Sequence, residues 1–530
     1  MNFTHIFSLL FILLLFVTAN GYKILGIFPT MAKSHFIVGS SLMKGLVDKG
    51  HEVTVISAFP QSTPLKNWRD IPTPAIVEKT KILIDNVAQK TNPWSFEVIM
   101  NLSEMGVWFA EIMLYEPAVQ QLLHSNETFD LIILEIFANE AHLGFAAKFN
   151  APIVGISAFG ANIWNSDMVG NPSPPSYIPN HFVQLTDHMN LFERIKNLFV
   201  VIFERIYNDL IYLPKQKYLY ETMFPGDEKP DFYELRKNVS LILLNNHFSV
   251  SFPRPLVPNM IEVGGMHIHR ERKPLPNDIK EFLDEAIDGA IYFSMGSVVK
   301  SNTLPIKKLE DILRVFGSLK QRILWKWEDE ELPGKSDNIL IRNWFPQDDV
   351  LSHPNIKLFI THGGLLSTIE AIYHGVPILG VPVYGDQFWN TLRAEKAGLG
   401  LSVPLEDLTR ENLDDAIKRI LNSSIFKIKA KEVSKIYKDQ PLTPLETAIF
   451  WVEYVARHKG AVHLKSGGQE LSFIEYHNLD VWAIILMAFF IPLCLVQMCL
   501  RSICRKICRK NKKEEVSQKK PKKSKKQKEN

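Results

Sequence analysis

Short apolar runs alternate with amphipathic stretches along the first part of the chain. Residues 22–30 and 51–57 are apolar runs of strand length, and residues 36–49 between them carry apolar side chains at helical spacing. The order strand, helix, strand is typical of a parallel sheet, and the apolar runs at 131–137 and 152–157 extend it. The first half of the chain is therefore predicted to form a doubly wound α/β domain.

The same alternation restarts in the second half of the chain. Apolar runs at 290–297, 323–328 and 338–343 are predicted to be strands of a second sheet. The pattern therefore predicts an α/β protein with two doubly wound domains. Their expected ranges are 22–272 and 290–475, with a linker at 273–289.

Two stretches lack a clear place in this alternation. Residues 68–115 indicate helices and loops that could wall a cleft, but their periodicity is blurred. Residues 191–213 place apolar side chains on one broad helical face, with charges opposite. That face could lie on a membrane surface, cap an acceptor site, or pack into a core or an interface.

Apolar segments stand near both ends of the chain. Residues 1–21 join an apolar stretch to small residues, as in a cleaved signal peptide, although the segment lacks Lys and Arg at its start. Residues 481–500 contain no charge and are long enough to span a bilayer as one helix. Because Lys and Arg crowd the tail at 501–530, we expect a single-pass type I protein with a lumenal body and a cytosolic tail.

Charge and cysteine usage refine this topology. The net charge of +3 hides fourteen Lys or Arg against three Glu in the tail, so the rest of the chain is net acidic. Such a tail could contact nucleic acid or anionic lipid, and its place after a membrane span favours lipid and no nucleic acid. All four cysteines lie in or beside the span, so disulfides cannot hold the lumenal body together.

Two short signals agree with a lumenal body. Lysines third and fifth from the end match the K-x-K-x-x pattern of resident endoplasmic-reticulum membrane proteins, which predicts that membrane as the location. Four N-x-S/T sequons beyond the predicted signal peptide make a glycoprotein possible, and they begin at Asn101, Asn126, Asn238 and Asn422.

The stretch at 341–390 carries the clearest chemistry. A short apolar run ends in a Thr-His-Gly-Gly turn at 361–364, and a helix is predicted to start near Leu365. Glycines let a ligand approach the backbone closely, and the free N–H groups of a helix's first turn bind anions, so we expect a phosphate there with His362 as a donor. Asp386 and Gln387 follow a second buried strand, at the edge where open α/β sheets bind ligands.

This stretch resembles the signature of the UDP-glycosyltransferase family. The run FITHGGLLSTIEAIYHGVPILGVPVYGDQ matches the signature with its spacing, and WFPQ at 344–347 matches the family's W-x-P-Q. The resemblance extends over nearly the whole chain and looks nearest to the insect enzymes. It implies the GT-B fold, in which two Rossmann-like domains face a cleft. It also implies an inverting transfer of a hexosyl group, with glucose favoured, from a UDP-sugar to a hydroxyl of a small lipophilic acceptor.

The resemblance implies a donor site in the second domain. Trp344 would stack on the uracil beside Gln347, and Glu370 would accept hydrogen bonds from the ribose. The residues near the glycine turn would hold the diphosphate, and Asp386 with Gln387 the sugar hydroxyls. The full UDP-sugar set is Ser297, Trp344, Gln347, His362, Gly364, Ser367, Glu370, Asp386 and Gln387. No D-x-D motif or His/Cys cluster occurs, which agrees with a co-substrate that needs no metal or other cofactor.

For the acceptor, the resemblance points to His35 as the catalytic residue. An imidazole after the first strand can take the proton of the acceptor hydroxyl. Its carboxylate partner stays open between Glu135, where vertebrate relatives carry Asp, and Glu140, where many insect relatives carry Asp. Each Glu is one methylene longer than Asp, which changes the geometry of a pair with His35. The alternative function is therefore a non-catalytic member of the family that binds lipophilic ligands or partner proteins. The acceptor's identity and a possible homo-oligomer stay open.

Overall fold

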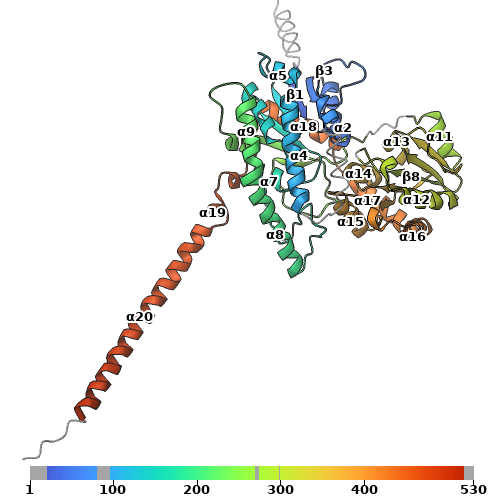
Figure 1. Ribbon diagram of the computed structural model, residues 1–530. Helices are drawn as coiled ribbons and strands as arrows, with labels where there is room; N and C mark the ends of the chain where they lie inside the picture. The colour runs from blue at the N-terminus through green and yellow to red at the C-terminus, as the bar shows by residue number, and fades with distance from the viewer. Residues whose placement is uncertain (1–20, 80–95, 269–273, 298, 519–530) are drawn as a thin grey trace, which may run out of the picture. The chain divides into compact units, whose positions relative to one another are not determined.

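The computed structural model describes residues 21–79, 96–268, 274–297 and 299–518 (Figure 1). The chain divides into two compact units, residues 1–469 and 470–530. The predicted signal peptide, apart from residue 21, and the K-x-K-x-x pattern lie outside the described residues.

The first sheet holds seven parallel strands. Their spatial order is β3-β2-β1-β4-β5-β6-β7, so the order reverses between β1 and β4. Ligands of doubly wound sheets bind beyond the carboxyl ends of the strands at such a reversal. The strands are β1 (Lys23–Phe28), β2 (Glu52–Ser57), β3 (Trp68–Pro72), β4 (Leu131–Glu135), β5 (Ile153–Ser157), β6 (Val239–Leu244) and β7 (Met260–Glu262).

The second sheet holds six parallel strands. Their order is β10-β9-β8-β11-β12-β13, which reverses between β8 and β11. The strands are β8 (Ala290–Ser294), β9 (Arg322–Lys326), β10 (Ile339–Arg342), β11 (Ile356–Thr361), β12 (Ile378–Gly380) and β13 (Gly400–Ser402).

Helices cover both faces of each sheet. Along β1, Leu25 and Ile27 belong to one buried cluster and Ile24 and Phe28 to another, because successive side chains of a strand point to opposite faces. Parallel strands buried on both faces need nearly continuous apolar sequence, which explains why the strands of both sheets could be predicted from their apolar runs.

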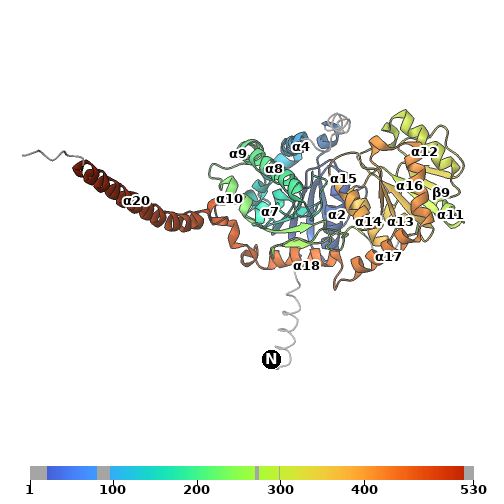
Figure 2. The ribbon, with the colours of Figure 1, turned by 90° about the horizontal axis from the view of Figure 1, so that it is seen from below.

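One helix of the second predicted range packs on the first sheet. Helix α18 (Pro444–Arg457) contributes Ile449 and Val452 to the cluster that also holds side chains of β1 and of α2 (Lys33–Asp48). A Cβ atom at Gly45 of α2 would lie 2.9 Å from Cδ1 of Ile449, so glycine allows this close approach. Figure 2 shows α18, in orange, beside the blue and green elements of the first domain. The range 290–475 therefore contains a helix of the first core.

The range predicted as a linker contains a helix. In α11 (Asn277–Asp284), the apolar residues Ile279 and Leu283 stand four positions apart and are buried in the second core. The spacing places both side chains on one face of the helix. The range 273–289 therefore includes a helix that packs into the core of the second sheet.

The helix predicted at 191–213 has an unusual polarity. In α8 (Leu191–Tyr207) the buried side chains include Asn197 and Glu204. The Asn197 amide donates to the backbone oxygens of Pro175 and Ile178 at 2.7 and 2.8 Å, and Asn180 donates to Glu204. Part of the apolar face packs into the first core, through Tyr207 with Val200 and Phe203 beside it. The rest is exposed, and its exposed members are Leu191, Phe192, Ile195, Leu198, Phe199, Ile202 and Ile206.

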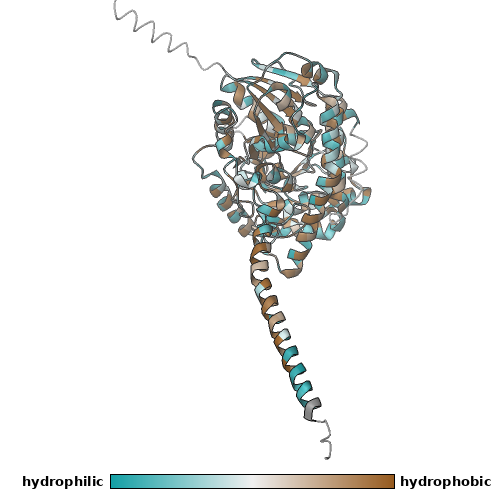
Figure 3. Ribbon diagram, turned by 90° about the vertical axis from the view of Figure 1, so that its left-hand side faces the viewer, coloured by the Kyte–Doolittle hydropathy of each residue, from teal (hydrophilic) through white to brown (hydrophobic). Residues whose placement is uncertain are grey.

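The second unit consists mainly of one long helix. Helix α20 (Leu479–Gln518) contains the predicted span, and its first part is apolar and its last part hydrophilic (Figure 3). It is long and apolar enough to cross a membrane. Its four cysteines are exposed and free.

The packing of α18 leads to a prediction about stability. Ile449→Ala should lower the free energy of unfolding by about 2–5 kcal/mol, the usual cost of emptying such a core position. The loss should appear in the first domain, as faster amide hydrogen exchange in β1 and β2. Ile428→Ala removes an exposed side chain and serves as the control. Unchanged exchange in β1 and β2 would contradict the role of α18.

Candidate active site

A cavity of about 540 Å³ lies where the carboxyl ends of the two sheets face each other. Its walls include the segments that follow β1, β4, β5 and β7 in one domain and β8, β10, β11 and β12 in the other. All nine predicted donor-site residues line it, and so does His35. Neither Glu135 nor Glu140 is part of its lining.

His35 is paired with Glu135. The imidazole stands in the first turn of α2, and its Nδ1 lies 2.6 Å from Oε1 of Glu135, the last residue of β4. The two meet because β1 and β4 are neighbours in the sheet, so the loop after β1 passes the end of β4. A carboxylate only accepts hydrogen bonds, so Nδ1 carries the proton and Nε2 keeps its lone pair.

The surroundings hold this pair in place. The Glu135 side chain is 2% exposed and that of His35 14%. Thr30 Oγ1 donates to the second oxygen of Glu135 at 3.5 Å. The rings of Phe137 and Phe159 pack edge-on against the imidazole, with centroids 5.1 and 5.3 Å away. These contacts limit the positions that the pair can adopt, and His35 itself lines the cavity.

Glu140 has a different partner. It begins the short helix η1 (Glu140–Leu143), and it accepts a hydrogen bond from the Tyr212 hydroxyl. Burial raises the pKa of Tyr212 well above its ordinary value, and the neighbouring Glu140 adds to this rise. Of the two candidate carboxylates, only Glu135 contacts His35.

The glycine turn has the predicted form. Helix α14 (Leu365–His374) starts after Gly364, and Gly363 has a φ of +82°, which favours glycine. The His362 ring lies against the backbone of two glycines: added Cβ atoms at Gly296 and Gly364 would stand 2.4 and 2.5 Å from its atoms. Burial lowers the pKa of His362 to about 4, and the charge of Lys326 contributes. The imidazole is therefore neutral near pH 7.

Glu370 is the centre of a small polar network. The Gln347 amide donates to Oε2 of Glu370 at 2.6 Å and to Ser367 Oγ at 3.0 Å. The His267 Nε2 lies 3.1 Å from Oε1 of Glu370. Both carboxylate oxygens are thus held, with lone pairs to spare for further donors.

The Trp344 ring is partly exposed and has a charged neighbour. It is 45% exposed although it lines the cavity. The Lys33 ammonium, from the first turn of α2, lies 3.9 Å from the centroid of the ring, a cation–π distance. This contact joins the two domains.

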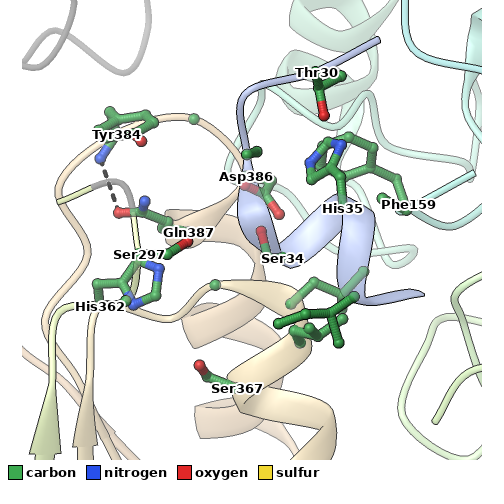
Figure 4. Close-up of a pocket in the computed structure, with 18 of the residues that line it drawn as sticks. Thr30, Ser34, His35, Phe159, Ser297, His362, Ser367, Tyr384, Asp386 and Gln387 are labelled. Carbon is green, nitrogen blue, oxygen red and sulfur yellow. Dashed lines mark hydrogen bonds between the residues drawn. The ribbon is translucent and has the colours of Figure 1, made fainter. Parts of the chain in front are cut away.

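Asp386 and Gln387 line the same cavity (Figure 4). Gln387 begins α15 (Gln387–Lys396), and its side-chain oxygen accepts hydrogen bonds from the backbone N–H groups of Val383 and Tyr384 at 2.9 and 3.1 Å. Burial raises the pKa of Asp386, whereas a hydrogen bond from Asn390 and the nearby His35 oppose the rise. Asp386 is therefore close enough to His35 for the two to interact electrostatically.

Several cavity residues were missed by the sequence reasoning. His267, Lys326 and Lys33 all border the site or one of its residues. His267 follows two glycines after the apolar run that became β7, which is the signal that could have found it. Lys326 is the last residue of β9, and its Nζ lies 2.6 Å from Oε1 of Glu328. No sequence pattern indicated that this lysine borders the site.

A family model matches nearly the whole chain. The model described as "UDP-glucoronosyl and UDP-glucosyl transferase" aligns with residues 23–514.

Characterised relatives match over similar lengths. The chain is 36% identical to UDP-glucosyltransferase 2 of Dactylopius coccus, over 92% of this chain and 93% of that protein. It is 31% identical to UDP-glucuronosyltransferase 2A3 of Mus musculus, over 92% of this chain and 93% of that protein.

A solved structure shares the fold. A complex of a UDP-glucosyltransferase from Polygonum tinctorium with 3,4-dichloroaniline superposes with a TM-score of 0.53 at 17% identity, over 82% of this chain and 98% of that one. The predicted GT-B fold is confirmed.

The burial of a neutral His362 leads to a prediction about pH. Its folded pKa of about 4 lies below the ordinary histidine value of 6.5, so the unfolded chain binds more protons between these values. The free energy of unfolding should therefore fall as the pH drops from 6.5 towards 4. His362→Gln should make this fall shallower in denaturant titrations of the full chain. His188→Gln, at an exposed histidine, should not. Equal slopes for the wild type and His362→Gln would contradict the burial argument.

Proposed function

Because this chain belongs to the UDP-glucuronosyl and UDP-glucosyl transferase family, we propose that it transfers a hexosyl group, with glucose favoured, from a UDP-sugar to a hydroxyl of a small lipophilic acceptor. The chain is a glycosyltransferase, as its relatives over most of its length establish. The observation that carries the finer proposal is the His35–Glu135 pair at the same cavity as the nine donor-site residues.

We assign the donor to the second domain. The partly exposed Trp344 ring suits stacking of a uracil, and the spare lone pairs of Glu370 suit the ribose hydroxyls. The diphosphate would lie at the start of α14 near Ser297, where backbone N–H groups and the neutral His362 can donate to it. The sugar would then lie between this turn and Asp386 and Gln387, and no metal is needed for these contacts.

The acceptor wall supports a lipophilic substrate. Helix α4 (Phe96–Leu114) contributes an apolar wall to the cavity. The residues of this wall are Val98, Leu102, Met105 and Phe109, and they belong to the first domain, whereas the donor residues belong to the second. Apolar walls with few polar groups are typical of sites for small organic ligands. Asn101, one of the four sequons, lines the same cavity and is half-buried, so it is a poor glycosylation site, whereas Asn126, Asn238 and Asn422 are exposed.

In the proposed reaction, His35 is the general base. Glu135 holds the proton on Nδ1, so Nε2 can accept the proton of the acceptor hydroxyl. The acceptor oxygen forms a bond to C1 of the sugar as the bond from C1 to the phosphate oxygen breaks. UDP leaves with the bonding electrons, and Glu135 stabilises the imidazolium. One such displacement inverts the configuration at C1.

The rival function is a non-catalytic protein that binds lipophilic ligands. Its main support was the extra methylene of Glu at the partner position. The 2.6 Å contact indicates that Glu135 nonetheless reaches His35, which favours the enzyme. Mass spectrometry of products formed from UDP-glucose, UDP-glucuronate and UDP-galactose with pooled lipophilic acceptors distinguishes the rival and identifies the sugar.

We also propose the location. The apolar helix α20 supports a single-pass membrane anchor. The basic residues that follow it favour a cytosolic tail and a lumenal body, and the endoplasmic reticulum is the membrane proposed.

The donor assignment predicts a binding defect. Trp344→Ala and Glu370→Ala should each weaken the binding of UDP itself, because stacking and ribose hydrogen bonds exist in both the ground and the transition state. Calorimetry with UDP measures the effect on the detergent-solubilised chain. Ile428→Ala, at an exposed position of the same domain, is the control. Normal affinity in both site variants would reject the placement of the nucleotide.

The base assignment predicts a turnover defect. His35→Ala should keep UDP-sugar binding and lower kcat by roughly 10² to 10⁴, with a smaller loss for an acidic phenol than for an aliphatic alcohol. Glu135→Gln should also lower kcat strongly, since an amide cannot stabilise imidazolium. Glu140→Gln is the matched control, because Glu140 contacts Tyr212 instead. The assignment fails if His35→Ala stays active on an aliphatic alcohol or if Glu140→Gln is the more damaging variant.

A further inference from the structure

His267 joins the first domain to the proposed nucleotide site. Its Nε2 lies 3.1 Å from Oε1 of Glu370, and the two side chains are only 2% and 8% exposed. The histidine comes from the segment after β7, whereas Glu370 stands on α14 of the second domain. This is therefore a buried polar contact between residues of the two domains, at the wall of the cavity.

The backbone around His267 is held in place by its neighbours. A Cβ atom at Gly264 would lie 2.6 Å from the backbone oxygen of Asn246, and Gly265 has a φ of +87°, so both positions favour glycine. On either side of the histidine, Met266 is buried in the first core and Ile268 packs against the second. His267 thus stands where the backbone passes from one core to the other, and its ring has little freedom to move.

The bond to Glu370 also defines the state of the ring. The other nitrogen, Nδ1, is buried and has no hydrogen-bond partner among the described residues. An unpaired acceptor costs less than an unpaired donor, and the carboxylate requires a donor, so Nε2 carries the proton. The only described polar contact of the ring is the one with Glu370.

We propose that His267 is a positioning residue for ribose recognition. This proposal rests on the proposed function, in which Glu370 accepts hydrogen bonds from the ribose hydroxyls. His267 holds one carboxylate oxygen and Gln347 the other, so the plane of the carboxylate is fixed before the nucleotide binds. The remaining lone pairs then point in set directions. Without His267, the carboxylate turns towards other donors and recognises the ribose less well.

The test compares UDP with 2′,3′-dideoxy-UDP, which lacks the hydroxyls that Glu370 would bind. Calorimetry is done on the full chain in detergent with both nucleotides. His267→Leu should weaken UDP binding roughly tenfold, the scale of a hydrogen bond to a charged group, and leave the binding of the dideoxy compound nearly unchanged. His267→Gln, which keeps an N–H donor near the place of Nε2, should retain most of the affinity. The KM for the UDP-sugar should rise in His267→Leu with kcat nearly constant.

A matched control separates positioning from general damage. His51 makes the same kind of contact, with Nε2 3.1 Å from a Glu453 oxygen, away from the cavity. His51→Leu should leave the preference for UDP over the dideoxy compound unchanged. Equal loss of both nucleotides in His267→Leu, or no loss of either, overturns the proposal.

Glu370→Ala, which removes both acceptor oxygens, separates this proposal from the proposed function. If it keeps the full preference for UDP, Glu370 does not bind the ribose, and both the donor assignment and this proposal are wrong. If it loses the preference while His267→Leu keeps it, Glu370 binds the ribose and only the role of His267 is overturned.

Discussion

The polarity of parallel strands is the constraint on which this molecule depends. Every strand of a parallel sheet delivers its carboxyl end to the same edge. In the first sheet that edge carries His35 and Glu135, and in the second it carries the glycine turn and Glu370. Because the two edges face one cavity, residues that are hundreds of positions apart in the chain need only short loops to meet.

The two sheet edges can bind one ligand together only if the distance between the domains is fixed. Three contacts between the domains fix it. Helix α18 returns to the first domain after the second is complete, and buries Ile449 there. The pair of His267 and Glu370 joins the domains within the cavity wall. The Lys33 ammonium covers the ring of Trp344 from the opposite domain. The apolar contact supplies burial, whereas the two polar contacts involve residues of the site itself.

The features that could be predicted from the sequence are those formed by neighbouring residues in the chain. The turn around Gly364 and its neighbour His362 could be predicted because a strand, two glycines and a helix start are contiguous. The choice between Glu135 and Glu140 could not, since it depends on the neighbours of β4 in the sheet and on Tyr212, which is seventy-two positions from Glu140. The place of α18 was equally hidden, because an amphipathic helix does not reveal which sheet it covers. In α8 the periodicity was correct, but Asn197 and Glu204 have buried partners that only the fold brings near.

The polarity of α8 has a consequence for handling the protein. Deleting α20 removes the apolar span but leaves the outward side chains of α8 in place. A shortened chain ending near Gln469 therefore keeps an exposed apolar surface that favours aggregation, since contiguous exposed apolar side chains drive association in water. Polar replacements such as Phe192→Ser and Phe199→Ser, together with truncation, should therefore raise the solubility of the body. These replacements leave the inward amide and carboxylate of the helix, and so its attachment to the domain, untouched.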